Sequence, residues 1–256
     1  MKRTGFFLVT LVLHFALAAA GLMGASDSAL AKSKLNIHQA TLEEPNPVTP
    51  EITTEELEKI LASGNEPVLD VRSRNEYAIA HIPGSINLYE KEVEQIVERY
   101  PDKKTGMVLY CNGPFCGKSR RLSEQLVKRG YTGVRRYQLG LPVWRALGLT
   151  VQTDLEGFGY VFRGDKTAVF VDARSRAEFE AGSLPGAVSI RVGEAEKANE
   201  DGRLPHKDKG TRVIVFANSA REAREIAREI ARKAYWNSSY FGGAFEELRR
   251  ARLWPR

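Results

Sequence analysis

The sequence contains little cysteine and histidine, with 2 and 4 of these residues among 256. A secreted fold that depends on disulfides usually carries several cysteines at wide spacings. Two close cysteines without paired histidines at ligand spacing do not form a zinc site either. The composition therefore argues against a disulfide-rich scaffold and against a metal centre, and it indicates no cofactor.

The sequence also lacks a second hydrophobic run beyond its first 31 residues. A membrane-spanning helix needs about 20 apolar residues. At the N-terminus, Lys2 and Arg3 precede an apolar stretch at 6–20. Ala31 closes a small-residue cleavage site, and the three alanines at 18–20 offer a second one. We interpret residues 1–31 as a signal peptide and expect a periplasmic or secreted protein without stable membrane insertion after signal removal. An uncleaved anchor is the alternative.

A basic stripe interleaved with aromatic residues, as nucleic-acid-binding surfaces carry, is absent as well. The formal net charge is +6, from 38 basic and 32 acidic residues. In the segment 221–225 the two signs alternate, as on a solvated helix face. We therefore expect no nucleic-acid partner, and a small anion near a few cations of one loop is the better match. No protein partner is indicated.

What the sequence does contain is an internal repeat. The segment 70–77 recurs at 172–179, and the segment 81–86 recurs at 183–188, both at an offset of 102 residues. A repeat of this length indicates a duplicated domain and not a solenoid. The domains are expected at 51–150 and 160–256, after a polar, proline-containing tether at 32–50.

Each repeat alternates short apolar strands with helical patterns. In the first repeat the pattern predicts strands near 67–71, 85–88, 107–110 and 134–137. It predicts helices near 53–63, 74–80, 91–99, 119–129 and 142–147. This alternation indicates an α/β fold in which each domain is a mainly parallel sheet with helices on both faces.

Both cysteines lie in one short segment, 110–119. Cys111 directly follows an apolar strand, and Cys116 precedes the helix that the pattern predicts from Ser119. Backbone N–H groups converge at such a place and stabilise a thiolate or a bound anion. Two core cysteines or a structural disulfide are the alternatives. Glycine, proline, asparagine and lysine around the thiols disfavour a packed core, and a disulfide would close only a tiny loop.

These residues together resemble the rhodanese family in a tandem two-domain form. The matching pieces are 69–72, 76–77, 81–87, 109–111, and Tyr137, Gly140 and Trp144. The resemblance implies two rhodanese-like domains and a sulfurtransferase. In such an enzyme a cysteine thiolate takes sulfane sulfur from a small anionic donor such as thiosulfate and passes it to a thiol or cyanide acceptor.

By this match Cys111 is the nucleophile, and the loop after it cradles the persulfide. The implied substrate-binding residues are Asn112, Gly113, Phe115, Gly117, Lys118, Ser119 and Arg120. Asp70 and Arg72 belong to the repeated motif and are expected to support the fold around the site, because turn chemistry explains them. The cations Lys118, Arg120 and Arg121 are expected to attract a dianionic donor and to lower the pKa of the thiol. Exposed helix positions are the alternative for the two arginines.

The sequence departs from the family pattern at several positions. The loop after Cys111 is longer than usual, Cys116 is an extra thiol within it, and Ala80 stands where the family often has glycine. Ala217 occupies the position of Cys111 in the second repeat. Alanine cannot act as a nucleophile, so the second domain is expected to be inactive and to serve as a structural or docking partner.

Three other functions stay open. A thiol redox protein would use Cys116 to resolve oxidised Cys111, although the spacing differs from the C-x-x-C of disulfide oxidoreductases. A phosphatase-like enzyme would need arginine at position 117, which is glycine. A non-catalytic binding module would retain the fold alone. His81 lies in a His-Ile-Pro-Gly turn, so we interpret it as a structural residue and not as a base.

Overall fold

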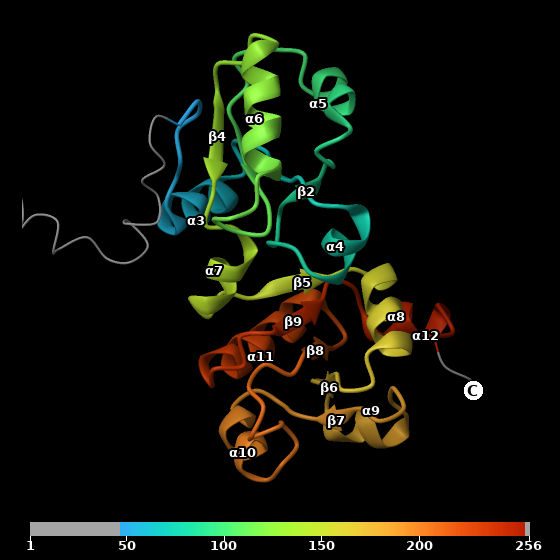
Figure 1. Ribbon diagram of the computed structural model, residues 1–256. Coiled ribbons are helices and arrows are strands. Elements are labelled where there is room, and N and C mark those ends of the chain that lie inside the picture. Colours follow the sequence, from blue (N-terminus) through green and yellow to red (C-terminus); the bar gives the residue numbers. More distant parts are fainter. Residues whose placement is uncertain (1–46, 254–256) are drawn as a thin grey trace, which may run out of the picture. The chain divides into compact units, whose positions relative to one another are not determined.

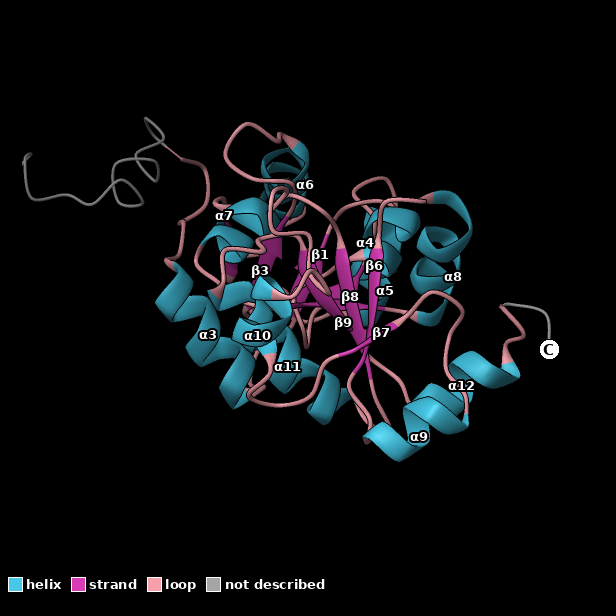
Figure 2. Ribbon diagram, turned by 90° about the horizontal axis from the view of Figure 1, so that it is seen from below, coloured by secondary structure: helices cyan, strands magenta, loops and turns pink. Residues whose placement is uncertain are grey.

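The computed structural model describes residues 47–253, which belong to one compact unit. The predicted signal peptide and most of the predicted tether lie outside these residues. The described chain forms two parallel β-sheets with helices around them (Figures 1 and 2). The prediction of an α/β fold with two parallel-sheet units is confirmed.

The first sheet has the strand order β2-β1-β3-β4, with every pair parallel. Its strands are β1 (Val68–Asp70), β2 (Ile86–Asn87), β3 (Met107–Tyr110) and β4 (Val134–Tyr137). All residues of β1 and β3 are buried. The sequence pattern made these strands recognisable, because a strand covered on both faces is continuously apolar.

Helices connect the strands of the first sheet. They are α3 (Thr54–Ser63), α4 (Arg74–Ile79), α5 (Val93–Arg99), α6 (Lys118–Lys128) and α7 (Gly140–Ala146). The Thr53 side chain and Glu56 form a capping box at the start of α3, and Gly64 ends the helix with φ of +64°. Ser73 and Glu76 cap α4 in the same way. The observed bounds of these helices differ from the predicted ones by two residues or fewer, and for α3 and α4 the caps are the local signals that mark the helix start.

Both faces of the first sheet are covered. On one face, Ile96 of α5 and Leu122 of α6 pack in a cluster that also contains Leu109 and Cys111. On the other face, the Thr54 hydroxyl of α3 lies 3.0 Å from the Tyr137 hydroxyl of β4. The strand ends are thus held in a fixed frame, and β3 delivers Cys111 to the carboxyl edge of the sheet.

The second sheet repeats this architecture with one more strand, in the order β5-β9-β8-β6-β7. Its strands are β5 (Val151–Thr153), β6 (Val169–Asp172), β7 (Val188–Ser189), β8 (Val213–Phe216) and β9 (Ser238–Phe241). Its helices are α8 (Leu155–Gly164), α9 (Arg176–Ala181), α10 (Ala195–Glu200), α11 (Ala220–Arg232) and α12 (Phe245–Arg250). One apolar cluster joins the sheet to α10 and α11, and another joins it to α8 and α12.

Two segments that the sequence left outside the domains are part of the packed structure. Residues 151–159 contain β5, which pairs with β9, and the first half of α8, whose Phe158 is fully buried. Near the N-terminus, Thr49 is buried and its hydroxyl accepts a hydrogen bond from Arg136 Nε at 3.0 Å. The last residues of the predicted tether therefore pack against the first sheet.

Backbone pairing joins the first sheet's loops to strand β5. The amide of His81 donates to the carbonyl of Gln152, and the reverse bond is also made, both at 2.9 Å. The His81 ring stacks on Tyr77 with 3.8 Å between ring centroids, and its Nδ1 lies 2.9 Å from the Tyr77 carbonyl. These contacts agree with the structural interpretation of His81.

Within residues 47–253, no helix has the length and apolar character that crossing a membrane requires.

Candidate active site

Cys111 immediately follows β3, the strand between β1 and β4. Its side chain is buried, with 1% of the residue exposed. Its carbonyl accepts a hydrogen bond from the Leu141 amide at 3.1 Å, which ties the strand end to α7. Sites in open parallel sheets lie at the carboxyl ends of strands, and Cys111 has this position.

The Cys111 thiol has two polar neighbours. Its Sγ atom donates to the carbonyl oxygen of Cys116 at 3.3 Å and lies 3.4 Å from the hydroxyl of Ser119. Burial and the hydrogen bond to Cys116 together raise the pKa of the thiol to about 11, although hydrogen bonds from Ser119 oppose the rise. The expectation of a lowered pKa is wrong for this conformation, because desolvation outweighs the helix start.

The cations near the loop are paired with carboxylates, which explains their weak effect on the thiol. Lys118 Nζ lies 3.1 Å from Glu76, and Arg121 lies 2.8 Å from Glu90. Arg120 Nε lies 3.1 Å from Glu124. A charge that a partner already neutralises adds little to the field at a neighbouring group.

Asp70 and Arg72 form a buried ion pair beside the strand ends. Arg72 Nη2 lies 2.6 Å from the Asp70 carboxylate, and the Arg72 amide also donates to this carboxylate at 3.0 Å. The remaining nitrogen of the fork, Nη1, donates to the Asn112 side chain at 3.2 Å. The pair therefore positions the first loop residue after Cys111, and neither residue contacts the thiol.

Glu76 joins the loop to the start of α6. It accepts hydrogen bonds from Asn112 at 2.6 Å and from Lys118 at 3.1 Å. Although burial opposes ionisation, bonds from Ser73, Asn112 and Lys118 lower the pKa of Glu76 to about 2. The carboxylate therefore stays ionised and holds both substrate-binding candidates in place.

The loop itself turns tightly above the thiol. Gly113 adopts φ of +103°, a conformation open to glycine, and its carbonyl accepts from the Cys116 amide at 2.9 Å. Gly117 precedes α6, and Phe115 is fully exposed at the loop tip. Cys116 is half-buried, and both cysteines are free thiols.

Gln138 is a residue of the site that the sequence analysis missed. Its Nε2 donates to the Pro114 carbonyl at 2.9 Å, and its Oε1 accepts from Ser119 at 3.2 Å and from Arg136 at 3.1 Å. It therefore holds the loop from the neighbouring strand end. The sequence signal that could have identified Gln138 was its position directly after β4, next to Tyr137, which matches the rhodanese pattern.

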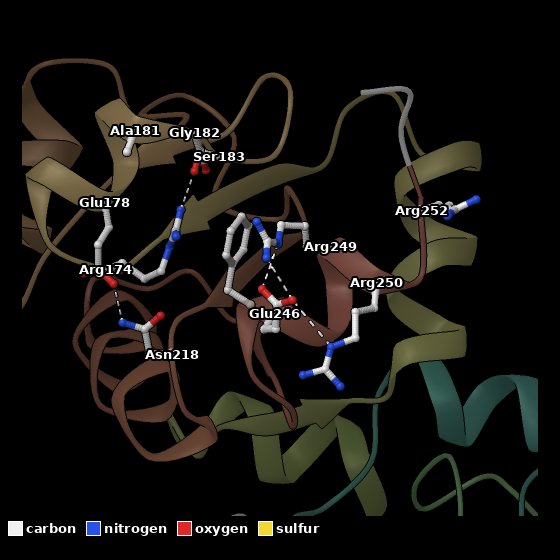
Figure 3. Close-up of a pocket in the computed structure, with 11 residues that line it drawn as sticks. Arg174, Glu178, Ala181, Gly182, Ser183, Asn218, Glu246, Arg249, Arg250 and Arg252 are labelled. Carbon is white, nitrogen blue, oxygen red and sulfur yellow. Dashed lines mark hydrogen bonds and ion pairs between the residues drawn. The ribbon is translucent and has the colours of Figure 1, made fainter.

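The second unit preserves the frame without the thiol, and Figure 3 shows the bond between Glu178 and Asn218 that belongs to it. Arg174 pairs with Asp172 at 2.7 Å, and Glu178 accepts from Asn218 at 2.7 Å. Ala217 is fully buried, and its carbonyl accepts from the Phe245 amide at 2.8 Å. Figure 3 also shows Arg249 and Arg250 of α12 paired with Glu246 of the same helix.

No group of three or more potential metal ligands gathers anywhere in residues 47–253. The fold and site thus define an α/β protein with one cysteine-centred site and a second unit that lacks the cysteine. The family described as "Rhodanese-like domain" matches residues 53–147 and 162–251. The chain belongs to this family.

Several known proteins are similar to part of this chain. The human thiosulfate:glutathione sulfurtransferase is 31% identical over 109 residues, which cover 37% of this chain and 92% of that protein. An HTH-type transcriptional regulator of Mycobacterium tuberculosis is 32% identical over 101 residues, which cover 39% of this chain and 43% of the regulator. A crystal structure of a thiosulfate sulfurtransferase from Pseudomonas aeruginosa aligns at 24% identity with a TM-score of 0.37, over 76% of this chain and 41% of that one.

Proposed function

We propose that this protein is a sulfurtransferase that carries sulfane sulfur as a persulfide on Cys111. The observation that carries the proposal is the Cys111 thiol at the end of β3, beneath a loop and next to Ser119 at the start of α6. Membership of the rhodanese-like family and the activity named for the human relative support it. The donor is thiosulfate or a persulfide, and the acceptor is a thiol or cyanide.

The reaction needs only the thiolate and two substrates. The Cys111 thiolate attacks the outer sulfur of thiosulfate, and the sulfur–sulfur bond of the donor breaks as its electron pair leaves with sulfite. The acceptor then attacks the terminal sulfur of the Cys111 persulfide. The second sulfur–sulfur bond breaks, and its electron pair returns to Cys111 as thiolate.

The surrounding groups prepare each step. Ser119 favours the ionised thiol, against the effect of burial. The Cys116 carbonyl accepts a hydrogen bond from the Cys111 thiol at 3.3 Å. Because a carbonyl oxygen repels an anion, the loop has to rearrange when the thiolate forms. An anionic donor competes with Glu76 for Lys118, whose ammonium lies at the helix start.

A thiosulfate:cyanide assay on three proteins tests the proposal. Wild type is expected to produce thiocyanate, Cys111→Ser is expected to lose all activity above background, and Cys116→Ser is expected to retain transfer. Mass spectrometry of the thiosulfate-treated protein is expected to show one added sulfur on Cys111. Transfer by Cys111→Ser would reject the mechanism.

Thiol redox chemistry is the second candidate, favoured by two free thiols in one loop. Cys116 packs against the same apolar cluster that contains Cys111. Thiol titration after mild oxidation separates the two functions. A sulfur atom that cyanide releases supports transfer, whereas a reversible Cys111–Cys116 disulfide without sulfane sulfur supports redox chemistry.

We also propose that the protein is exported, because the pattern at 1–31 is that of a signal peptide. The N-terminus of the protein isolated from its native host is expected to follow Ala31. A protein that keeps Met1 or its first apolar stretch would contradict cleavage. The second unit, with Ala217 in place of the cysteine, serves as a structural partner in this proposal.

A further inference from the structure

Three arginines of α11 share one face of the helix. Arg224, Arg228 and Arg232 are spaced four residues apart, so their side chains lie above one another. The sequence predicted a solvated helix face for the segment 221–225. This holds for Arg221, which is exposed, but Arg224 is half-buried. The three arginines line a cavity of about 900 Å³, which we call the arginine cleft.

The opposite wall of the arginine cleft comes from the first unit (α3 and α7 in Figure 1). Glu58 is the only carboxylate among the residues that line the cavity. Trp144 and Leu147 add apolar surface, and Leu147 is 43% exposed. The cleft therefore combines a cationic wall with an apolar one.

The floor of the cleft is held by hydrogen bonds, so the cavity is preformed. Tyr240 donates to the Gln152 side chain at 3.2 Å, and both residues line the cleft. Gln152 also makes the paired backbone bonds with His81, next to the lining residue Pro83. A cavity fixed in this way costs little conformational entropy when a ligand enters.

The positive charge of this face is balanced by no ion pair, although the Arg224 guanidinium lies 6.0 Å from the centre of the Tyr240 ring. Among residues 47–253, no carboxylate lies within ion-pair distance of Arg224, Arg228 or Arg232. The Nε atom of Arg224 is buried and has no hydrogen-bond partner among the described residues. Like charges one helical turn apart repel, and an unsatisfied buried donor on a charged group is costly. A bound anion would remove both penalties.

We propose that the arginine cleft binds a small organic anion that carries two or more negative groups and an apolar part. Arginine forks donate paired hydrogen bonds to carboxylate, sulfonate or phosphate oxygens in a bidentate geometry. The apolar part of the ligand packs against Leu147 and Trp144, across the cavity from the arginines. This site contains none of the residues around Cys111, so ligand binding there does not depend on sulfur transfer.

Isothermal titration calorimetry of the full-length chain with naphthalene-1,5-disulfonate tests the proposal. This dianion presents two sulfonates on an apolar ring system. Wild type is expected to bind one equivalent, with an affinity that falls as salt is added. Inorganic sulfate is expected to bind at least tenfold more weakly, because it lacks the apolar part. Equal binding of sulfate would overturn the claim of an amphipathic ligand.

Matched variants locate the binding. The double variant Arg228→Gln and Arg232→Gln is expected to weaken disulfonate binding at least tenfold, whereas Arg221→Gln, on the same helix but outside the cleft, changes it less than twofold. Glu58→Gln is expected to tighten binding, because it removes the only carboxylate of the lining. Equal effects of the double variant and Arg221→Gln would overturn the site. Circular dichroism checks that every variant is folded.

Discussion

The thiol of Cys111 donates a hydrogen bond to the backbone carbonyl of Cys116, 3.3 Å away. This contact places an acceptor where the persulfide chemistry requires donors. Burial of the thiol acts in the same direction, since both favour the protonated form. The structure therefore holds the Cys111 thiol in its protonated form, and the proposed sulfur transfer requires the loop to move when the thiolate forms.

The pH dependence of alkylation follows from this resting state. With a pKa of about 11 in place of the ordinary 9.0, the thiolate fraction at pH 8 falls about 100-fold. Iodoacetamide is therefore expected to modify Cys111 in the Cys116→Ser variant about 100-fold more slowly than it modifies a small-molecule thiol. The rate is expected to rise until about pH 11, and Ser119→Ala is expected to slow it further. A rate plateau near pH 8 would contradict the burial effect.

The same shift has a consequence for stability. The unfolded chain loses the Cys111 proton near pH 9, before the folded chain does, so the folded state is favoured below pH 9 and loses this advantage as the pH rises to about 11. Urea unfolding is expected to show a decrease of about 2–3 kcal/mol across this range that is attributable to Cys111. The Cys111→Ser variant is the control and is expected to lack this part of the decrease.

Glu76→Gln is expected to weaken the loop and to free Lys118. The folded-state pKa of Glu76 is about 2, so its stabilising effect is present above pH 4.5 and is lost as the pH falls towards 2. At pH 7 the variant is expected to lose about 1 kcal/mol of stability, a value that allows for partial exposure of the carboxylate. The KM for thiosulfate is expected to fall about two- to fivefold, because Lys118 no longer has a competing partner.

Glu178→Gln is the matched control for Glu76→Gln. Glu178 makes the equivalent bond to Asn218 in the second unit. Its substitution is expected to leave the KM for thiosulfate unchanged, because the second unit has no thiol. Equal changes in KM for the two variants would show that the effect does not arise at the Cys111 loop.

Arg72→Met is expected to destabilise the protein by about 3–5 kcal/mol, because it leaves the Asp70 carboxylate buried without a partner. Arg174→Met breaks the equivalent pair and is expected to cost a similar amount. Only Arg72→Met is expected to reduce sulfur transfer in the remaining folded protein, since Arg72 also holds Asn112. Urea unfolding and the thiosulfate:cyanide assay measure the two effects. An equal loss of transfer in both variants would refute the positioning role.

Gly140→Ala is expected to disrupt the site from the opposite side of the loop. Gly140 has φ of +63°, and a Cβ atom there would overlap the Cys111 carbonyl oxygen and the Gly113 amide. Gly148 has φ of +74° but open space around the same position. Gly148→Ala is therefore expected to cost only the strain of its left-handed conformation, about 1 kcal/mol. Thermal unfolding and sulfur transfer are expected to fall much further in Gly140→Ala.

Much of the architecture was predictable because its signals are local. The strands predicted at 107–110 and 134–137 appear as β3 and β4 with these bounds. The capping boxes at Thr53 and Ser73 begin α3 and α4 where the pattern placed them. Strand β5 was missed because it lies between the two predicted domains and outside the matched repeat segments, and its pairing with β9 identifies it.

The amino-acid order alone was enough to place Cys111 at a strand end and Ala217 at the equivalent position of the second repeat. Hydrophobic periodicity and internal repetition can both be recognised in the sequence. The folded state decided everything that depends on residues far apart in sequence. Glu76 pairs with Lys118 and Glu90 pairs with Arg121, the cations that were expected to lower the pKa of the Cys111 thiol. Burial raises the pKa of that thiol instead. Packing also turned the arginines of α11 towards a cavity. Desolvation and charge pairing act through space, and therefore they appear only once the chain is folded.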